Sequence, residues 1–320
     1  MSLLELKNVT KRCPDGFTLE DISFEISEKG IYAFLGNSRS GKSMLAELIC
    51  GATDFDEGEM LFKGKNIADK SVSKSRKMKI GYVPQNNFFP VDMTVCELLD
   101  FTGRIKKVDP DKRVRQIKEA LELTGLFEKS DIIILNLTPS ERKRVAYANA
   151  LLGNPDIIVI DDPISAVDPA QREEIKKILV MLGKVKVVIL FASKGSDLEE
   201  LFKTVGILDD GKLLVYEQTD ALLSKINKNF NALLRVRINS NKLSDMLSAI
   251  RSVDEVISAS TLYVSTISDI KIECLTRESV TLKVTECAEN FGAEIVSLRF
   301  TSFCIDDVVD AFCSEPKKEE

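Results

Sequence analysis

A glycine-rich segment at residues 36–43 constrains the fold of this chain more than any other part of its sequence. It satisfies the phosphate-binding pattern G-x-x-x-x-G-K-[ST] at every position. The apolar run 31–35 before it is typical of a buried strand, and residues 44–50 after it are typical of a helix. Strand, loop and helix are the context that this pattern requires, so the sequence predicts a phosphate-binding loop at the start of a helix.

The residue types in this loop indicate how it would bind a nucleoside triphosphate. Backbone N–H groups of the loop and the N-terminus of the helix would face the phosphates. Lys42 would reach the β- and γ-phosphates, and the Ser43 hydroxyl would bind Mg²⁺. The predicted phosphate-binding residues are Gly36, Asn37, Ser38, Arg39, Ser40, Gly41, Lys42 and Ser43.

The composition excludes several functional classes. The 320 residues contain no histidine, which rules out imidazole general-base catalysis and histidine-ligated metals. A formal net charge of −6 gives no reason to expect nucleic acid as a partner. Seven cysteines without a C-x-x-C pair predict free thiols in a reducing compartment. No apolar run approaches about 18 residues and the first residues lack a signal-peptide pattern, so we expect a cytoplasmic protein.

Short apolar strands alternate with amphipathic helices along residues 1–219, which predicts an α/β core domain with a parallel sheet. Early hairpins predict an antiparallel β subdomain, and helices between about 87 and 152 predict a helical insert. The Lys/Ser-rich stretch 70–79 is interpreted as a solvated connector. The predicted strands are 3–10, 17–26, 60–62, 80–83, 157–160, 185–191, 205–208 and 212–216, and the predicted helices are 94–104, 109–123, 140–152, 171–182 and 197–202.

Residues 220–320 differ in character and predict a small α+β accessory domain. Two successive β-α-β units are the basis for expecting a ferredoxin-like arrangement. The predicted order is helix 221–228, strand 232–238, helix 241–252, strands 254–264 and 269–274, helix 277–290, strand 293–300 and helix 304–312.

Further motifs accompany the phosphate loop in a specific order. Gln85 follows a strand, the segment 137–146 begins a basic helix, Asp161 ends a buried strand, and residues 165–168 read Ser-Ala-Val-Asp. This order and spacing resemble the ATP-binding subunit of ABC transporters over residues 2–219. By layout more than by motif, residues 220–320 resemble the C-terminal extension of bacterial export-type subunits.

The resemblance implies ATP and Mg²⁺ as ligands and a P-loop NTPase core as the fold. Ser43 and Asp161 would bind Mg²⁺, and Gln85 would sense both the metal and the γ-phosphate. Asp162 stands where the family has the glutamate that polarises the attacking water. Asp162 and Gln85 are therefore the predicted catalytic residues.

The resemblance also implies partners. Two such subunits would pair head to tail, as a homodimer or a heterodimer, and the segment 137–141 of one would contact the nucleotide held by the other, through Thr138 and Ser140. Residues 165–168 would cross the same interface. The helical insert would dock on a separate multi-span membrane subunit, which would hold the protein at the inner face of the cell membrane.

Several positions depart from the family pattern and predict low ATPase activity. Pro139 removes a backbone N–H, Ser140 adds a side chain, and Glu141 puts a negative charge near a triphosphate. Asp162 reaches about 1.5 Å less far than glutamate, and displacing a general base by that much can lower the rate about 10²-fold. Ser193 replaces the switch histidine.

One departure concerns the base of the nucleotide. Cys13 stands where an adenine-stacking tyrosine is usual, so either Phe17 or Tyr32 takes over the stacking or the stacking is weak. The sequence leaves this choice open.

Other interpretations also stay open. Asp161 and Asp162 fit a helix cap after a strand. Taken alone, residues 137–145 predict a basic helix that Ser140 caps, with 142–144 on a solvated face. The leading hypothesis is the ATP-binding subunit of an ABC exporter with slow hydrolysis. The alternative is a non-transport ABC ATPase or an ATP-gated regulatory module with little or no hydrolysis.

Overall fold

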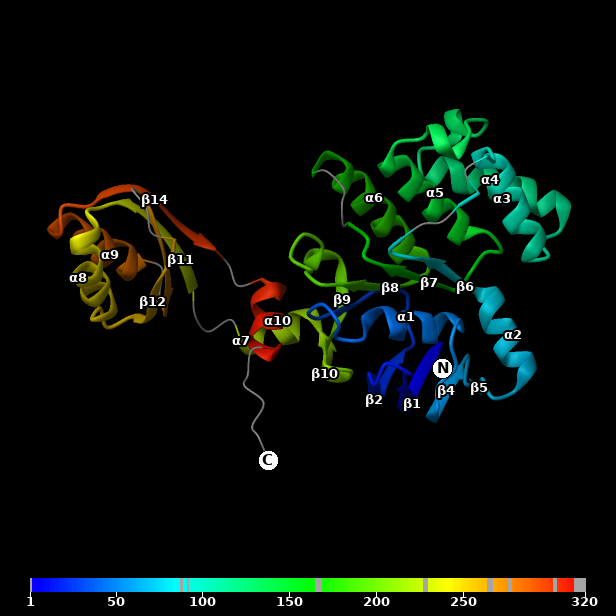
Figure 1. Ribbon diagram of the computed structural model, residues 1–320, viewed down its shortest axis with the longest axis horizontal. Helices are drawn as coiled ribbons and strands as arrows, with labels where there is room; N and C mark the ends of the chain where they lie inside the picture. The colour runs from blue at the N-terminus through cyan, green and yellow to red at the C-terminus, as the bar shows by residue number, and fades with distance from the viewer. Residues whose placement is uncertain are drawn as a thin grey trace. The chain divides into compact units, whose positions relative to one another are not determined.

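The computed structural model describes two compact units of the chain (Figure 1). One unit comprises residues 1–219 and 309–320, and the other comprises residues 220–308. The residues that the structure describes are 2–86, 89–90, 92–164, 169–226, 230–263, 267–275, 278–301 and 304–313.

A six-stranded sheet forms the centre of the first unit, in the order β10-β9-β3-β8-β7-β6 (Figure 1). Strands β9, β3, β8, β7 and β6 are parallel, and β10 pairs antiparallel with β9 at the edge. Continuous apolar, β-branched runs suit strands that are covered on both faces. Their bounds are β3 Gly30–Leu35, β6 Ile80–Val83, β7 Ile157–Asp161, β8 Val187–Ala192, β9 Phe202–Asp209 and β10 Lys212–Gln218.

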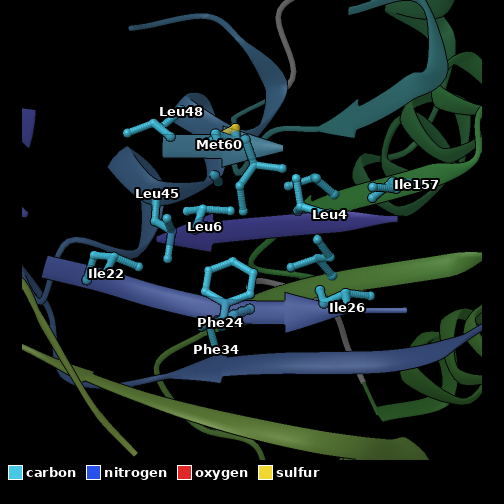
Figure 2. Close-up of a cluster of buried hydrophobic side chains, with 14 of the residues drawn as sticks. Leu4, Leu6, Ile22, Phe24, Ile26, Phe34, Leu45, Leu48, Met60 and Ile157 are labelled. Carbon is cyan, nitrogen blue, oxygen red and sulfur yellow. The ribbon is translucent and has the colours of Figure 1, made fainter. Parts of the chain in front are cut away.

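A smaller antiparallel sheet, in the order β2-β1-β4-β5, packs against helix α1 (Lys42–Cys50). Figure 2 shows Leu45 and Leu48 of α1 beside Leu4, Phe24 and Met60 of this sheet. These side chains belong to one buried cluster, which also contains residues of β3, β7 and β8. The helix that follows the phosphate loop is therefore fixed inside the core. The strand bounds are β1 Leu4–Arg12, β2 Thr18–Ile26, β4 Glu57–Phe62 and β5 Lys65–Asn66.

The turn between β9 and β10 connects this sheet to the phosphate loop through Gly211. Its N–H donates to the Ser40 carbonyl at 3.2 Å, and its carbonyl accepts from the Glu20 N–H at 2.9 Å. Its φ of 80° is left-handed, and a Cβ here would lie 1.8 Å from the Thr18 carbonyl oxygen. Only glycine fits this position without a rearrangement.

Residues 70–79 form a helix, α2 (Lys70–Lys79), so the expectation of a solvated connector was wrong. Asp69 caps its first turn by accepting from the Ser71 N–H at 2.7 Å. Arg76 is 1% exposed and donates to the Leu48 carbonyl at the end of α1, at 3.3 Å. A cation is favourable beside the C-terminal carbonyls of a helix, which explains why a polar segment folds against the core.

The predicted helical insert is present between β6 and β7. Thr94 begins its first helix with a capping box, in which the Glu97 N–H donates to Thr94 Oγ1 at 3.2 Å and the Thr94 N–H donates to Glu97 Oε2 at 2.8 Å. The insert contains α3 Val95–Ile105, α4 Pro110–Leu123 and α5 Pro139–Leu151, with short 3₁₀ turns at Phe127–Lys129 and Ile134–Asn136.

Lys106, at the end of α3, provides a pH test of this packing. Its Nζ donates to the Leu152 carbonyl at 2.7 Å, and burial together with the charge of Lys79 lowers the pKa of Lys106 from 10.5 to about 8. Between these values the unfolded chain binds more protons, so the free energy of unfolding rises with pH over that interval. We expect a rise of up to about 3 kcal/mol in the wild type that is absent in Lys106→Met.

Denaturant unfolding of both proteins across this interval measures the effect. Parallel stability curves for the wild type and Lys106→Met would contradict it.

The second unit contains an antiparallel sheet in the order β12-β13-β11-β14. Helices α8 and α9 contact each other, and they contact β12 and β14 respectively. Both the β-α-β-β-α-β order and the strand order are the ferredoxin-like arrangement predicted from the sequence. The bounds are β11 Phe230–Arg237, α8 Ser240–Arg251, β12 Val256–Tyr263, β13 Ser268–Cys274, α9 Glu278–Asn290 and β14 Glu294–Thr301.

The remaining elements are α6 Pro169–Val185, a 3₁₀ turn at Glu199–Leu201, α7 Thr219–Ile226 and α10 Ile305–Cys313. Among the described residues, none of the helices combines the length and apolar character needed to cross a lipid bilayer.

Candidate nucleotide-binding site

A cavity of about 660 Å³ lies where β3, β6, β7 and β8 end at the same edge of the sheet. Ligands of open α/β sheets bind outside the carboxyl ends of the strands, and this volume suits a small molecule. The residues that line it include Phe17, Ser38, Arg39, Gly41, Lys42, Ser43, Gln85, Asp161, Asp162 and Ser193.

The phosphate loop joins β3 to α1 at this cavity. Gly41 is the residue before the helix, and its φ is 99°. This left-handed φ favours glycine, and a Cβ at Gly41 would also lie 2.6 Å from Leu19 Cδ2 in the core. No side chain caps the helix start, so the first N–H groups of α1 remain available to an anion.

Lys42 supplies a cation at the base of the loop. Its Nζ donates to the carbonyl oxygens of Gly36 and Asn37, at 2.8 and 2.7 Å, and to Ser40 Oγ at 3.0 Å. Burial lowers the pKa of Lys42, and the charge of Asp161 acts in the opposite direction. The ammonium group is thus held within the loop, beside the cavity that a phosphate chain would occupy.

Asp161 ends β7, where it pairs in register with Phe191 of β8, and it is 6% exposed. Burial raises the pKa of Asp161, and a side-chain hydrogen bond with Ser43 opposes that shift. The fold therefore brings together two oxygen groups that lie 118 positions apart in the chain. Hydroxyl and carboxylate oxygens are ligands that Mg²⁺ prefers, so this pair fits the predicted metal.

The structure also brings Gln85 and Asp162 together. Gln85 Nε2 donates to Asp162 Oδ2 at 3.2 Å, although 77 positions separate the two residues in sequence. The Asp162 N–H donates to the Phe191 carbonyl at 2.8 Å, and the φ of Asp162 is 57°. The two predicted catalytic side chains thus face the same cavity.

For the adenine, the structure decides between the two aromatic candidates. Tyr32 is 4% exposed and its hydroxyl donates to the Glu28 carbonyl at 2.9 Å, so Tyr32 cannot stack on a base. Of the two candidates, Phe17 lines the cavity, so the choice that remains is between stacking on Phe17 and weak stacking. Ser193 also lines the cavity, at the end of β8.

Thr138, and not Ser140, caps α5, so the interpretation of Ser140 as the cap was wrong. Thr138 Oγ1 accepts from the Glu141 N–H at 3.3 Å, and the Thr138 N–H donates to Glu141 Oε2 at 2.8 Å. Lys129 Nζ donates to Glu141 Oε1. The expected negative charge of Glu141 is therefore neutralised locally. The lining of the cavity includes neither Thr138 nor Ser140, and residues 165–168 lie outside the described residues.

The basic run 142–144 is not a solvated face, which corrects a second interpretation. Lys143 is only 6% exposed, and its Nζ donates to the Asp162 carbonyl oxygen at 2.8 Å. Arg142 Nη2 donates to the Leu135 carbonyl at 2.8 Å, and Arg144 Nη1 donates to the Thr124 carbonyl at 3.3 Å. The burial of Lys143 could not be predicted from the sequence, because nothing distinguishes it from the two arginines on either side.

Arg39 gives a stability test of the loop. Its φ of 67° is left-handed, a conformation that is strained for a residue with a Cβ. We expect Arg39→Gly to raise the free energy of unfolding by about 0.5–1 kcal/mol. Arg104→Gly, inside α3, is the matched control and should lower it by about 1 kcal/mol. Denaturant midpoints measure both, and a destabilised Arg39→Gly would contradict the strain.

Comparisons of the sequence agree with this geometry. The profile of the family described as ABC transporter matches residues 19–165. A molybdate/tungstate import ATP-binding protein from Methanocaldococcus jannaschii is 30% identical over 243 residues, which cover 75% of this chain and 79% of that protein. An uncharacterized ABC transporter ATP-binding protein from Synechocystis sp. is 28% identical over 200 residues, which cover 62% of this chain and 55% of that protein.

Solved structures give the same answer for the fold. A dimeric ATP-binding cassette in a post-hydrolysis state, bound to ADP and phosphate, has a TM-score of 0.61 and 27% identity, and the match covers 68% of this chain and 98% of that one. A protein of an ABC transporter complex from Clostridium perfringens has a TM-score of 0.62 and 24% identity, with 71% and 94% covered, which shows a likeness of fold alone. This chain belongs to the family of ABC transporter ATP-binding proteins, whose domains are ATPases.

Proposed function

We propose that this chain binds ATP with Mg²⁺ in the cavity at the carboxyl edge of its sheet, hydrolyses the ATP slowly and couples that cycle to a separate membrane subunit. One observation carries the proposal. Lys42, the Ser43–Asp161 pair and the Gln85–Asp162 pair come from three separate segments, and all of them line one cavity at the start of α1.

Each group has a distinct role in this proposal. The loop amides and Lys42 bind the phosphates, and Ser43 and Asp161 hold the Mg²⁺ that accompanies ATP and neutralises phosphate charge. Gln85 orients the Asp162 carboxylate through the hydrogen bond at 3.2 Å. Asp162 positions the attacking water and accepts its proton, which is the role of a general base.

Slow hydrolysis follows from what surrounds the base. Asp162 has a short side chain that is already bonded to Gln85, and Ser193 lines the cavity with a hydroxyl, which is not basic at neutral pH. The absence of histidine from the sequence leaves no imidazole to assist. We expect the purified chain to release phosphate well below the ordinary enzyme median of roughly 10 per second. Turnover at that median under saturating ATP and Mg²⁺ would contradict slow hydrolysis.

We further propose a head-to-tail dimer, in which Thr138 and Ser140 at the start of α5 contact the nucleotide of the other subunit. The related dimeric cassette supports this arrangement. In the proposed complex the helical insert docks on a multi-span membrane subunit at the inner face of the membrane. Exposed apolar side chains on the described part of the insert suit such a contact, and they include Phe101, Ile105, Phe127, Ile133 and Leu135.

Reconstitution with the membrane subunit tests the transport role. We expect co-purification of a multi-span protein and ATP-dependent export of its substrate, because residues 220–320 resemble the C-terminal extension of export-type subunits. The named relative is an import protein, so inside-out and right-side-out vesicles must be compared to determine direction. Association with a cytosolic complex alone would favour the alternative, an ATP-gated regulatory module.

A further inference from the structure

Lys143 is a buried charged group to which the hydrolysis scheme above gives no role. It lies near the start of α5 and is 6% exposed. Burying an ammonium group is strongly unfavourable unless it is hydrogen-bonded and near opposite charge. Both conditions hold here, because its Nζ donates to the Asp162 carbonyl oxygen at 2.8 Å and the carboxylates of Asp162 and Asp161 stabilise its charge.

The residue that Lys143 contacts has an unusual backbone. The φ of Asp162 is 57°, a left-handed value that surrounding contacts must stabilise. Its N–H is held by the Phe191 carbonyl at 2.8 Å, and its carboxylate is held by Gln85 at 3.2 Å. Lys143 supplies the contact to the carbonyl, so the three polar parts of Asp162 are each anchored by a different segment.

The side chain of α5 that donates to the Asp162 carbonyl is Lys143. Tyr147 lies one helical turn further on, and its hydroxyl is buried without a hydrogen-bond partner in the described part of the chain. The observed contact to the Asp162 carbonyl is therefore made by the ammonium group of Lys143 and not by Tyr147.

We propose that Lys143 is a positioning residue for ATP hydrolysis: its ammonium group holds the Asp162 peptide so that the Asp162 carboxylate stays beside Gln85 in the cavity. The proposal rests on the proposed role of Asp162 as the base. Because Thr138 caps the same helix, α5 connects the proposed dimer contact directly to the base.

Replacing Lys143 with methionine tests the proposal, since methionine keeps an unbranched apolar stem and removes the donor. We expect kcat for ATP to fall by about 10²-fold, because a displaced general base loses that much. The ATP affinity and KM should stay within about twofold of the wild type, since Lys143 does not line the cavity. Lys143→Arg keeps a cationic donor and should recover at least about tenfold of the loss.

Lys118→Met is the matched control. Its side chain is 63% exposed on α4, and we expect no change in kcat, KM or ATP affinity. An unchanged kcat in Lys143→Met would overturn the proposal. A loss of kcat that is matched by an equal loss of ATP affinity would also overturn it, since that pattern indicates a distorted site.

Amide hydrogen exchange keeps the test independent of the turnover rate. We expect the Asp162 amide to exchange about tenfold faster in Lys143→Met, but not in Lys118→Met, as its hydrogen bond to Phe191 loosens. Equal exchange in all three proteins would contradict the positioning contact even if hydrolysis is undetectable. Equal phosphate release by the wild type and Asp162→Asn would instead contradict the proposed function.

Discussion

Replacing Lys42 with alanine is expected to weaken ATP binding by about 100-fold or more. Two charge-assisted hydrogen bonds to phosphate oxygens, at about 1.5 kcal/mol each, account for a loss of this size. The ammonium group now bonds to the Gly36 and Asn37 carbonyls and to Ser40 Oγ, at 2.7 to 3.0 Å. These contacts are hydrogen bonds, so the ammonium group can exchange them for phosphate oxygens by turning toward the cavity. Titration with a fluorescent ATP analogue measures the affinity.

The control for this variant is Lys74→Ala, because Lys74 is an exposed lysine on α2. It should leave the affinity unchanged. If Lys42→Ala binds ATP as tightly as the wild type, Lys42 does not contribute to the proposed site. A fall in affinity that also appears for Lys74→Ala would indicate a general charge effect.

Replacing Asp162 with asparagine is expected to lower phosphate release by about 10²- to 10⁴-fold, the range over which a general base contributes, or to the uncatalysed background if that is reached first. Asparagine has the same shape and its Oδ1 can still accept from Gln85, so ATP affinity should stay unchanged. Steady-state phosphate release and ATP titration on the same samples separate the two effects. Identical phosphate release by both proteins would mean that the chain binds ATP without catalysing its hydrolysis.

Asp162→Glu is the matched carboxylate variant. Glutamate extends the carboxylate by about 1.5 Å, so it should hydrolyse ATP faster than the wild type. The left-handed φ of 57° at position 162 favours aspartate over glutamate. We therefore expect the increase in rate to be smaller than the roughly 10²-fold loss ascribed to the shorter side chain of aspartate. A Glu variant slower than Asp162→Asn would contradict the role of the carboxylate.

Much of the site could be predicted because its chemistry lies in short segments. The phosphate loop is eight consecutive residues in which glycine, lysine and serine each have one physical use. The apolar strands beside it are recognisable in the sequence, which showed that Gln85 follows one strand and Asp161 ends another, and the family resemblance implied their roles. The roles of Thr138 and Ser140 stay predictions, since the described chain holds a single subunit.

The errors share a different origin. Residues 70–79 read as a solvated connector because they are rich in lysine and serine, yet Asp69 caps them and Arg76 packs against α1. Ser140 read as a helix cap, yet the capping box starts two residues earlier, at Thr138. In each case the sequence contained the correct capping residue, and a stronger local signal concealed it.

The sequence by itself determined most of the elements, the strand–loop–helix at 31–50 and the class of ligand, because these depend on periodicity and on residue types close in the chain. Only the tertiary structure decided which polar groups are buried and what they contact. Tyr32, one of the open candidates for stacking, is buried with its hydroxyl bonded to the Glu28 carbonyl, and Lys143 contacts the Asp162 carbonyl 19 positions away. The physical reason is that the burial of a side chain depends on which element packs against it. That element is determined by the whole fold and not by the residues next to it in the sequence.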